Sequence, residues 1–243
     1  MSARREAILR EIGLAPLWKL RAAGAPAATD EAEPAPAAPQ AEPPPGEPAD
    51  ARRAAIANMD WAELGPAVAT CRACRLCERR KQAVLGVGDL QPDWLMVGEG
   101  PGAEEDERGE PFVGQAGKLL DNMLAAVGMA RGRGVYIANT VKCRPPGNRT
   151  PEAGEMAACF PYLERQIELL RPRLIVALGR PAAQTLLDRE VKIGAARGSV
   201  FEYRGIPLVV TYHPAYLLRN LPDKAKAWED LCFARTAMRG RAP

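Results

Sequence analysis

The sequence contains a single histidine and no long hydrophobic run. His213 is the one imidazole among 243 residues, so any chemistry that needs an imidazole must use this side chain. The longest apolar stretches, such as residues 174–178, have the length of a strand, which argues against a membrane-spanning helix. The N-terminus lacks the apolar core and cleavage site of a secretory signal. We therefore expect a cytoplasmic protein with no membrane partner.

Cysteine is more plentiful, with six residues, and in a cytoplasmic protein this favours metal binding over disulfides. Cys71 and Cys74 form a C-x2-C pair. Cys143 follows an expected strand, and Cys159 lies inside the next expected helix. Four thiolates complete either a zinc site or a 4Fe–4S cluster. The wide spacing of the second pair favours the bulkier cluster.

Two further cysteines leave the ligand set open. Cys77 forms another C-x2-C pair with Cys74 and is an alternative ligand. Cys232 lies in the last expected helix, where a free cysteine usually acts as a small buried hydrophobic residue.

The chain divides into segments of different composition. Residues 1–21 form a short amphipathic segment, and residues 22–55 are an Ala- and Pro-rich linker with almost no large apolar side chain. Such a linker cannot bury a core, so we expect a disordered N-terminal tail before a single domain at 56–243. The net charge of +3 permits nucleic-acid binding without arguing for it.

Strand-like and helix-like runs alternate after residue 56. This alternation predicts an α/β fold, a three-layer α/β/α sandwich around a four-stranded, mainly parallel sheet. The expected strands cover residues 94–98, 135–140, 174–178 and 206–212, and the expected helices cover 117–127, 151–170, 181–187 and 223–238.

Functional candidates follow these strands. A glycine-rich loop at 98–102, Asn139 and His213 each lie at or just after a strand end, where parallel sheets bind ligands. The amide of Asn139 both donates and accepts hydrogen bonds, so it can match the edge of a nucleobase. Phe112 lies in a second loop. Taken singly, the loop and Phe112 are equally compatible with structural roles, and a lone histidine after a strand is more often structural than catalytic.

Five motifs together resemble the family 4 (type-4, iron–sulfur) uracil-DNA glycosylases. They are CRAC (71–74), GEGPGAEED (98–106), PFVGQAG (111–117), NTVKCRPP (139–146) and HPAYLLRN (213–220). The resemblance implies base excision repair: a monomer flips uracil out of single- or double-stranded DNA and hydrolyses its N-glycosidic bond. It also implies a 4Fe–4S cluster on Cys71, Cys74, Cys143 and Cys159.

The resemblance also assigns site residues. It implies His213 and Glu99 as catalytic residues, with Glu105 as another candidate carboxylate. The implied uracil-binding residues are Glu99, Gly100, Pro101, Phe112, Asn139 and His213. Leu217 and Leu218 are candidates to wedge into the gap left by the flipped base.

Other interpretations stay open. A non-catalytic glycosylase-like nucleic-acid-binding module associated with replication would keep the fold without a working pocket, and a zinc-stabilised hydrolase would differ in its metal. Residues 4–21 resemble the N-terminal peptide of the psi subunit of bacterial DNA polymerase III. This suggests a replisome contact on a flexible tether.

Overall fold

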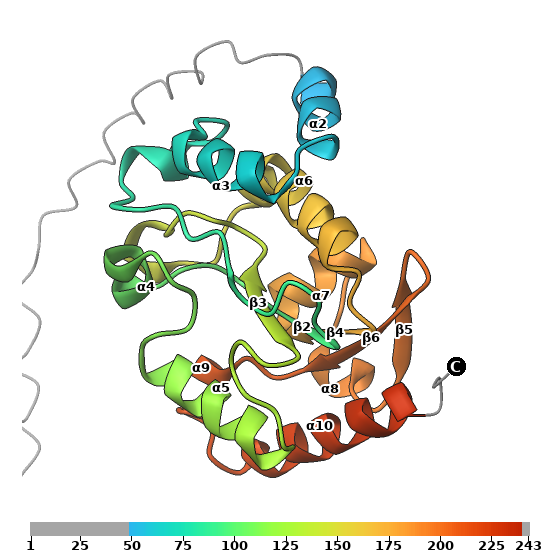
Figure 1. The fold of residues 1–243 in the computed structure, drawn as a ribbon. Helices are drawn as coiled ribbons and strands as arrows, with labels where there is room; N and C mark the ends of the chain where they lie inside the picture. Colours follow the sequence, from blue (N-terminus) through green and yellow to red (C-terminus); the bar gives the residue numbers. More distant parts are fainter. Residues whose placement is uncertain (1–48, 240–243) are drawn as a thin grey trace, which may run out of the picture. The chain divides into compact units, whose positions relative to one another are not determined.

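Six strands form one sheet in a computed structural model that describes residues 49–239 (Figure 1). The spatial order is β1-β3-β2-β4-β6-β5, and the four central strands β3, β2, β4 and β6 are parallel. The strands are β1 (Val87–Gly88), β2 (Trp94–Gly98), β3 (Val135–Asn139), β4 (Leu174–Leu178), β5 (Val200–Tyr203) and β6 (Ile206–Thr211).

The α/β class is confirmed, but the prediction of four strands was wrong. The two additional strands, β1 and β5, pair antiparallel at opposite edges of the sheet. Both lack the continuous apolar run that marks a buried strand. β1 has only two residues, and β5 has one buried residue among its four. A tight turn with Arg204 and Gly205 at positive φ joins β5 to β6 as a hairpin.

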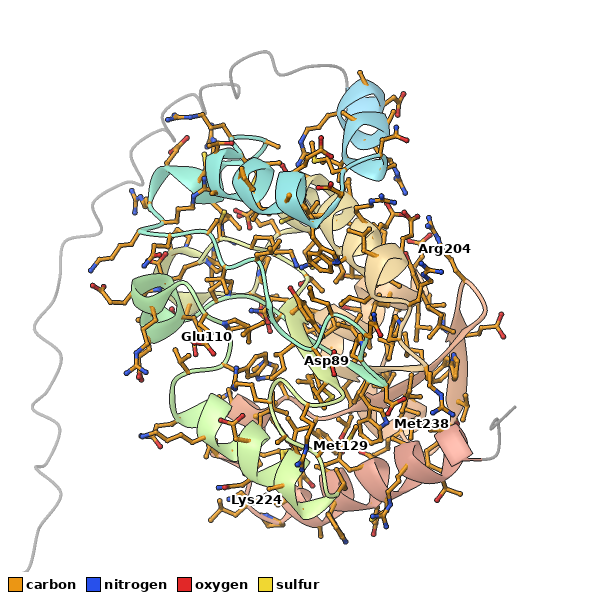
Figure 2. The ribbon with its side chains drawn as sticks, in the orientation of Figure 1. Asp89, Glu110, Met129, Arg204, Lys224 and Met238 are labelled. Atoms are coloured by element: carbon orange, nitrogen blue, oxygen red, sulfur yellow. The ribbon has the colours of Figure 1, made fainter. Side chains whose placement is uncertain are left out.

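Helices cover both faces of the sheet. Leu95 and Val97 of β2 point to the face packed by α6 (Ala153–Leu170), α7 (Arg180–Leu187) and α8 (Ile193–Ala196). Trp94 and Met96 point to the opposite face, covered by α5 (Gln115–Ala126) and α10 (Asp223–Arg239). In α10, Met238, labelled in Figure 2, accepts a hydrogen bond of 3.1 Å from the Trp94 indole. The alternation of β2 therefore builds two cores, one on each side.

Two local features differ from the sequence prediction. Helix α6 begins at Ala153 rather than residue 151, because Glu152 is its N-cap and the Glu152 backbone N–H donates to the Glu155 carboxylate at 2.8 Å. The acidic residues 104–107, for which no element was predicted, lie in helix α4 (Ala103–Arg108). Its Asp106 is buried, since it accepts hydrogen bonds from the backbone N–H groups of Lys81 and Gln82.

Helices α2 (Ala49–Ala57) and α3 (Trp61–Thr70) pack on α6. The linker prediction was therefore wrong for residues 49–55, which are helical and attached. Arg52 donates to the Ala158 carbonyl at 2.8 Å, and Arg53 donates to Glu164 at 2.7 Å. The remaining linker residues and the 4–21 segment lie outside the described residues.

Candidate active site

A pocket of about 440 Å³ opens at the carboxyl ends of β2, β3 and β6. The parallel strands bring their ends to one edge, so loops far apart in sequence meet there. The segment 145–151 and the short helix α9 (Pro214–Leu217) complete the wall. All the residues expected to bind the base line this pocket: Glu99, Gly100, Pro101, Phe112, Asn139 and His213.

Asn139 is the last residue of β3 and is almost fully buried, with 2 % of its surface exposed. Its side-chain oxygen Oδ1 has no hydrogen-bond partner within residues 49–239. A buried acceptor without a partner costs about 1–3 kcal/mol, so Asn139 Oδ1 is a candidate to accept a hydrogen bond from a molecule in the pocket. Gly98 makes the arrangement possible, because a Cβ there would lie 2.5 Å from Asn139 Oδ1.

Phe112 has a strained backbone, with φ at +55°. Arg131 holds it by donating hydrogen bonds to the carbonyls of Pro111 at 2.8 Å and Phe112 at 2.7 Å. Gly117 lets α5 approach, since a Cβ there would lie 1.7 Å from the Phe112 carbonyl oxygen. The surroundings thus fix a conformation that the free chain would avoid.

His213 is the N-cap of α9 and lines the pocket beside Phe112. Its Nδ1 accepts a hydrogen bond of 3.2 Å from the Ala215 N–H. Burial, followed by the charge of Arg219, lowers the pKa of His213 to about 4, with Glu105 acting in the opposite direction. The imidazole is therefore neutral near pH 7. Because Nδ1 accepts, the ring proton is on Nε2.

The two candidate carboxylates have different surroundings. Burial raises the pKa of Glu99, while Thr150 and Arg180 oppose the shift. Glu105 instead accepts three backbone hydrogen bonds, from the N–H groups of Gly102 (3.0 Å), Val113 (2.9 Å) and Gly114 (3.0 Å). Glu105 therefore ties the first pocket loop to the Phe112 loop, and Glu99 is the carboxylate without such backbone ties.

Comparison with known proteins identifies the family. The family model described as "Uracil DNA glycosylase superfamily" matches residues 85–232. The type-4 uracil-DNA glycosylase of Pyrobaculum aerophilum is 44 % identical over 183 residues, covering 72 % of this chain and 93 % of that protein. The Thermotoga maritima enzyme of the same name is 48 % identical over 161 residues, covering 65 % and 83 % respectively.

The chain belongs to the type-4 uracil-DNA glycosylases. In this glycosylase the cysteines form a second site, distinct from the pocket. Five of them line one small cavity between η1 (Arg75–Glu78), α6 and the segment after β3. They are Cys71, Cys74, Cys77, Cys143 and Cys159. Cys232 is not among them and is partly buried in α10.

The cysteine site of the glycosylase is surrounded by donors. Arg80 Nη1 lies 2.9 Å from Cys143 Sγ, and Arg52 Nη2 lies 3.6 Å from Cys71 Sγ. Burial raises the pKa of the Cys159 thiol to about 12, so this thiol stays protonated near pH 7 unless a cation binds its sulfur. Within residues 49–239, no three His, Cys, Asp or Glu side chains are arranged to hold a single metal ion.

The structure corrects one expectation and adds residues that sequence reasoning missed. Leu217 is fully buried and cannot wedge into DNA, whereas Leu218 is 40 % exposed. Arg131 was missed because no local pattern signals its contact with a loop nineteen residues away. The role of Glu105 had a signal, since it is the third residue after the N-cap Gly102.

None of the helices within 49–239 is long and apolar enough to span a membrane.

Proposed function

We propose that the pocket binds a uracil nucleotide flipped out of DNA, and that His213 and Glu99 support hydrolysis of its N-glycosidic bond. The observation that carries the proposal is the unpartnered Asn139 Oδ1, buried at the end of β3 beside the Phe112 ring. Uracil offers an N3–H donor and an O4 acceptor on one edge. The Asn139 carboxamide matches both, with Oδ1 accepting and Nδ2 donating.

This recognition excludes cytosine. Cytosine has an unprotonated N3 and an amino group in place of O4, so both hydrogen bonds to Asn139 would be lost. A site built for a polar group rejects an analogue that leaves its buried atoms unpaired, often by 10⁴-fold or more. Stacking on Phe112 adds about 1–3 kcal/mol without distinguishing between the bases.

His213 stabilises the leaving group. As the bond between C1′ and N1 breaks, its electron pair moves to uracil, and negative charge develops on O2. The Nε2–H of neutral His213 donates a hydrogen bond to O2, so no proton needs to be transferred. The lowered pKa of His213, caused first by burial, keeps this donor neutral and its Nδ1 bonded to Ala215.

Glu99 accepts a proton from the attacking water. Its carboxylate lines the pocket and is partly buried. The water oxygen bonds to C1′ of the oxocarbenium-like sugar, and Glu99 accepts the proton that the water loses. Glu105 already accepts hydrogen bonds from three backbone N–H groups. We therefore assign Glu105 the role of holding the loop and Glu99 the role of accepting the water proton.

The cysteine site would hold a 4Fe–4S cluster through Cys71, Cys74, Cys143 and Cys159. Such a cluster would take one thiolate on each of four iron atoms, so its ligands need not converge on a single ion. The residues fit such a group, because five thiols line one cavity and arginines approach two of their sulfurs. Cys77 is the alternative ligand. When bound, the cluster would cross-link η1, α6 and the segment after β3, ordering loops next to the pocket rather than taking part in the reaction.

The wider assignments are also proposals. We propose a monomeric glycosylase domain that starts at α2, acts on single- or double-stranded DNA in the cytoplasm and carries residues 1–48 as an appended segment. Residues 4–21 would contact the clamp loader. A pull-down with clamp-loader subunits, comparing the full chain with one starting at Ala49, tests this contact. Equal capture by both chains rejects it.

The decisive experiment is incubation with a uracil-containing oligonucleotide followed by alkali, which breaks the strand at abasic sites. We expect breakage at uracil, and loss of breakage in Asn139→Ala and His213→Ala. A protein with a full complement of iron that binds the oligonucleotide but cleaves neither single- nor double-stranded substrate would instead be the non-catalytic module.

A further inference from the structure

Lys142 lies between the cysteine site and Asn139, and the steps above do not use it. It is only 1 % exposed, a rare location for a lysine. Its ammonium Nζ donates to the Asn139 carbonyl oxygen at 2.8 Å and to Gln166 Oε1 at 2.5 Å. Its backbone N–H lies 3.2 Å from Cys159 Sγ, and its neighbour in the chain is Cys143. One residue therefore contacts both sites.

The ammonium itself is held in place. Gln166 comes from α6, and its Nε2 donates to the Leu85 carbonyl at 3.0 Å and to the Tyr136 hydroxyl at 3.4 Å. These bonds orient Gln166 Oε1 toward Lys142. The result is a continuous chain of hydrogen bonds from α6 through the ammonium to the backbone of Asn139.

A lysine is a costly way to fill this space. Burying a charge is unfavourable unless it is paired and hydrogen-bonded. The two acceptors of Lys142 are neutral, and the ionisable groups that act on it are Cys159 and Cys143. Thiolates bound to a cluster would supply the negative charge that the ammonium lacks. The cost is explained if the same side chain fixes the residue that recognises the base.

We propose that Lys142 is a positioning residue that couples the four-cysteine site to base recognition, by holding the Asn139 carbonyl while Cys159 holds the Lys142 backbone. The inference rests on the proposed function of Asn139. With the carbonyl fixed, the Asn139 side chain keeps Oδ1 in the pocket. Without the ammonium, the end of β3 is free to shift, and a misplacement of about 1 Å reduces catalysis by about 100-fold.

A matched pair of variants tests the role of the donor. Lys142→Met and Lys142→Gln introduce uncharged side chains of similar length, but only glutamine can donate to the Asn139 carbonyl. We expect kcat/KM for uracil in single-stranded DNA to fall about 100-fold in Lys142→Met. The inhibition constant for free uracil should rise in the same variant, and Lys142→Gln should recover most of both losses.

Iron content, visible absorbance and melting temperature are measured alongside, and activity is expressed per iron-loaded protein. Tyr203→Phe is the control, because the Tyr203 hydroxyl is another buried polar group without a partner in the described part of the chain. It lies in β5, and we expect wild-type kinetics.

Three results overturn the coupling. One is a Lys142→Met protein with wild-type kinetics, and another is equal impairment of the methionine and glutamine variants. The third is a loss that follows iron content alone, with the inhibition constant for uracil unchanged. Failure of the proposed function is recognised separately, because then the wild-type protein itself leaves uracil in place.

Discussion

The rings of Phe112 and His213 lie with their centroids 5.5 Å apart and their planes tilted by 32°. The first residue comes from the loop before α5 and the second from the end of β6, so the fold rather than the local sequence brings them together. Phe112 offers an apolar face for stacking, and His213 offers a donor at the edge of the same pocket. Base binding therefore depends on the contacts that hold this pair and its neighbours in place.

Gly98→Ala should abolish uracil excision while leaving the fold intact. The new methyl group would lie 2.5 Å from Asn139 Oδ1 and 2.6 Å from Phe112 Cζ, both closer than van der Waals contact. Both base-binding side chains would have to move, so we expect kcat/KM to fall by about 100-fold or more. Cleavage kinetics and circular dichroism check this result.

Gly154→Ala is the matched control for that variant. Gly154 lies in the first turn of α6, and a Cβ there meets nothing within 4 Å. Alanine favours the helix over glycine by about 1 kcal/mol. This variant should therefore melt slightly higher and cleave normally, and normal cleavage by Gly98→Ala would contradict the assigned geometry of the pocket.

Glu99 and Glu105 should separate in their kinetic effects. Glu99→Gln keeps the shape of the pocket but cannot accept the water proton, so kcat should fall while KM for the oligonucleotide changes little. Glu105→Ala removes the acceptor of three backbone N–H groups and loosens the Phe112 loop, so KM should rise and the melting temperature should fall. Reversed effects would exchange the two roles.

Cleavage should increase with pH along a single acid limb. Burial raises the pKa of Glu99 above its ordinary value of 4.5. The carboxylate that accepts the proton therefore forms at a higher pH than an exposed glutamate would. His213 is already neutral there, since burial first of all lowers its pKa to about 4. Single-turnover rates across pH 4–8 check this, and the limb should flatten in Glu99→Gln. An inflection that disappears only in His213 variants would contradict the assignment.

Stability should show the His213 shift with a defined sign. The pKa of His213, lowered mainly by burial, is about 4 when folded and 6.5 in the ordinary case. Between these values the unfolded chain binds a proton that the folded chain does not, so the contribution of His213 to the free energy of unfolding rises with pH across this window. Above it, the contribution is level. Urea titrations at a series of pH values give the free energy of unfolding. Its slope against pH should differ between wild type and His213→Gln only inside that window.

The sequence was sufficient for the central strands and for the placement of Asn139 and His213 at strand ends, because these depend on local signals. Residues 174–178 form a buried strand through an uninterrupted apolar run, and Asn139 and His213 lie at or just after the ends of their strands as predicted. The edge strand β5 was not predicted, because only one of its four residues is buried and the strand is defined by its pairing with β6. Local pattern carries no information on such pairing.

Long-range contacts explain the other omissions. Arg131 reaches the Phe112 carbonyl from beyond α5, and Lys142 reaches Gln166 in α6. Helix α2 was assigned to the linker because its composition is Ala-rich, with little apolar surface. Its attachment depends on Arg52 and Arg53, which find partners in α6. Such contacts become visible only once the chain is folded.

The fifth cysteine provides the last test. Cys159 is buried, and its sulfur accepts from the Lys142 backbone N–H, so Cys159→Ser should lose iron and visible absorbance. Cys77 lines the same cavity, but the proposed ligand set omits it, so Cys77→Ser should keep both. Cys232→Ser, in α10, is the control and should match the wild type. Iron and sulfide analysis distinguishes the sets: loss of iron in Cys77→Ser, with full iron in Cys71→Ser or Cys74→Ser, would make Cys77 the ligand.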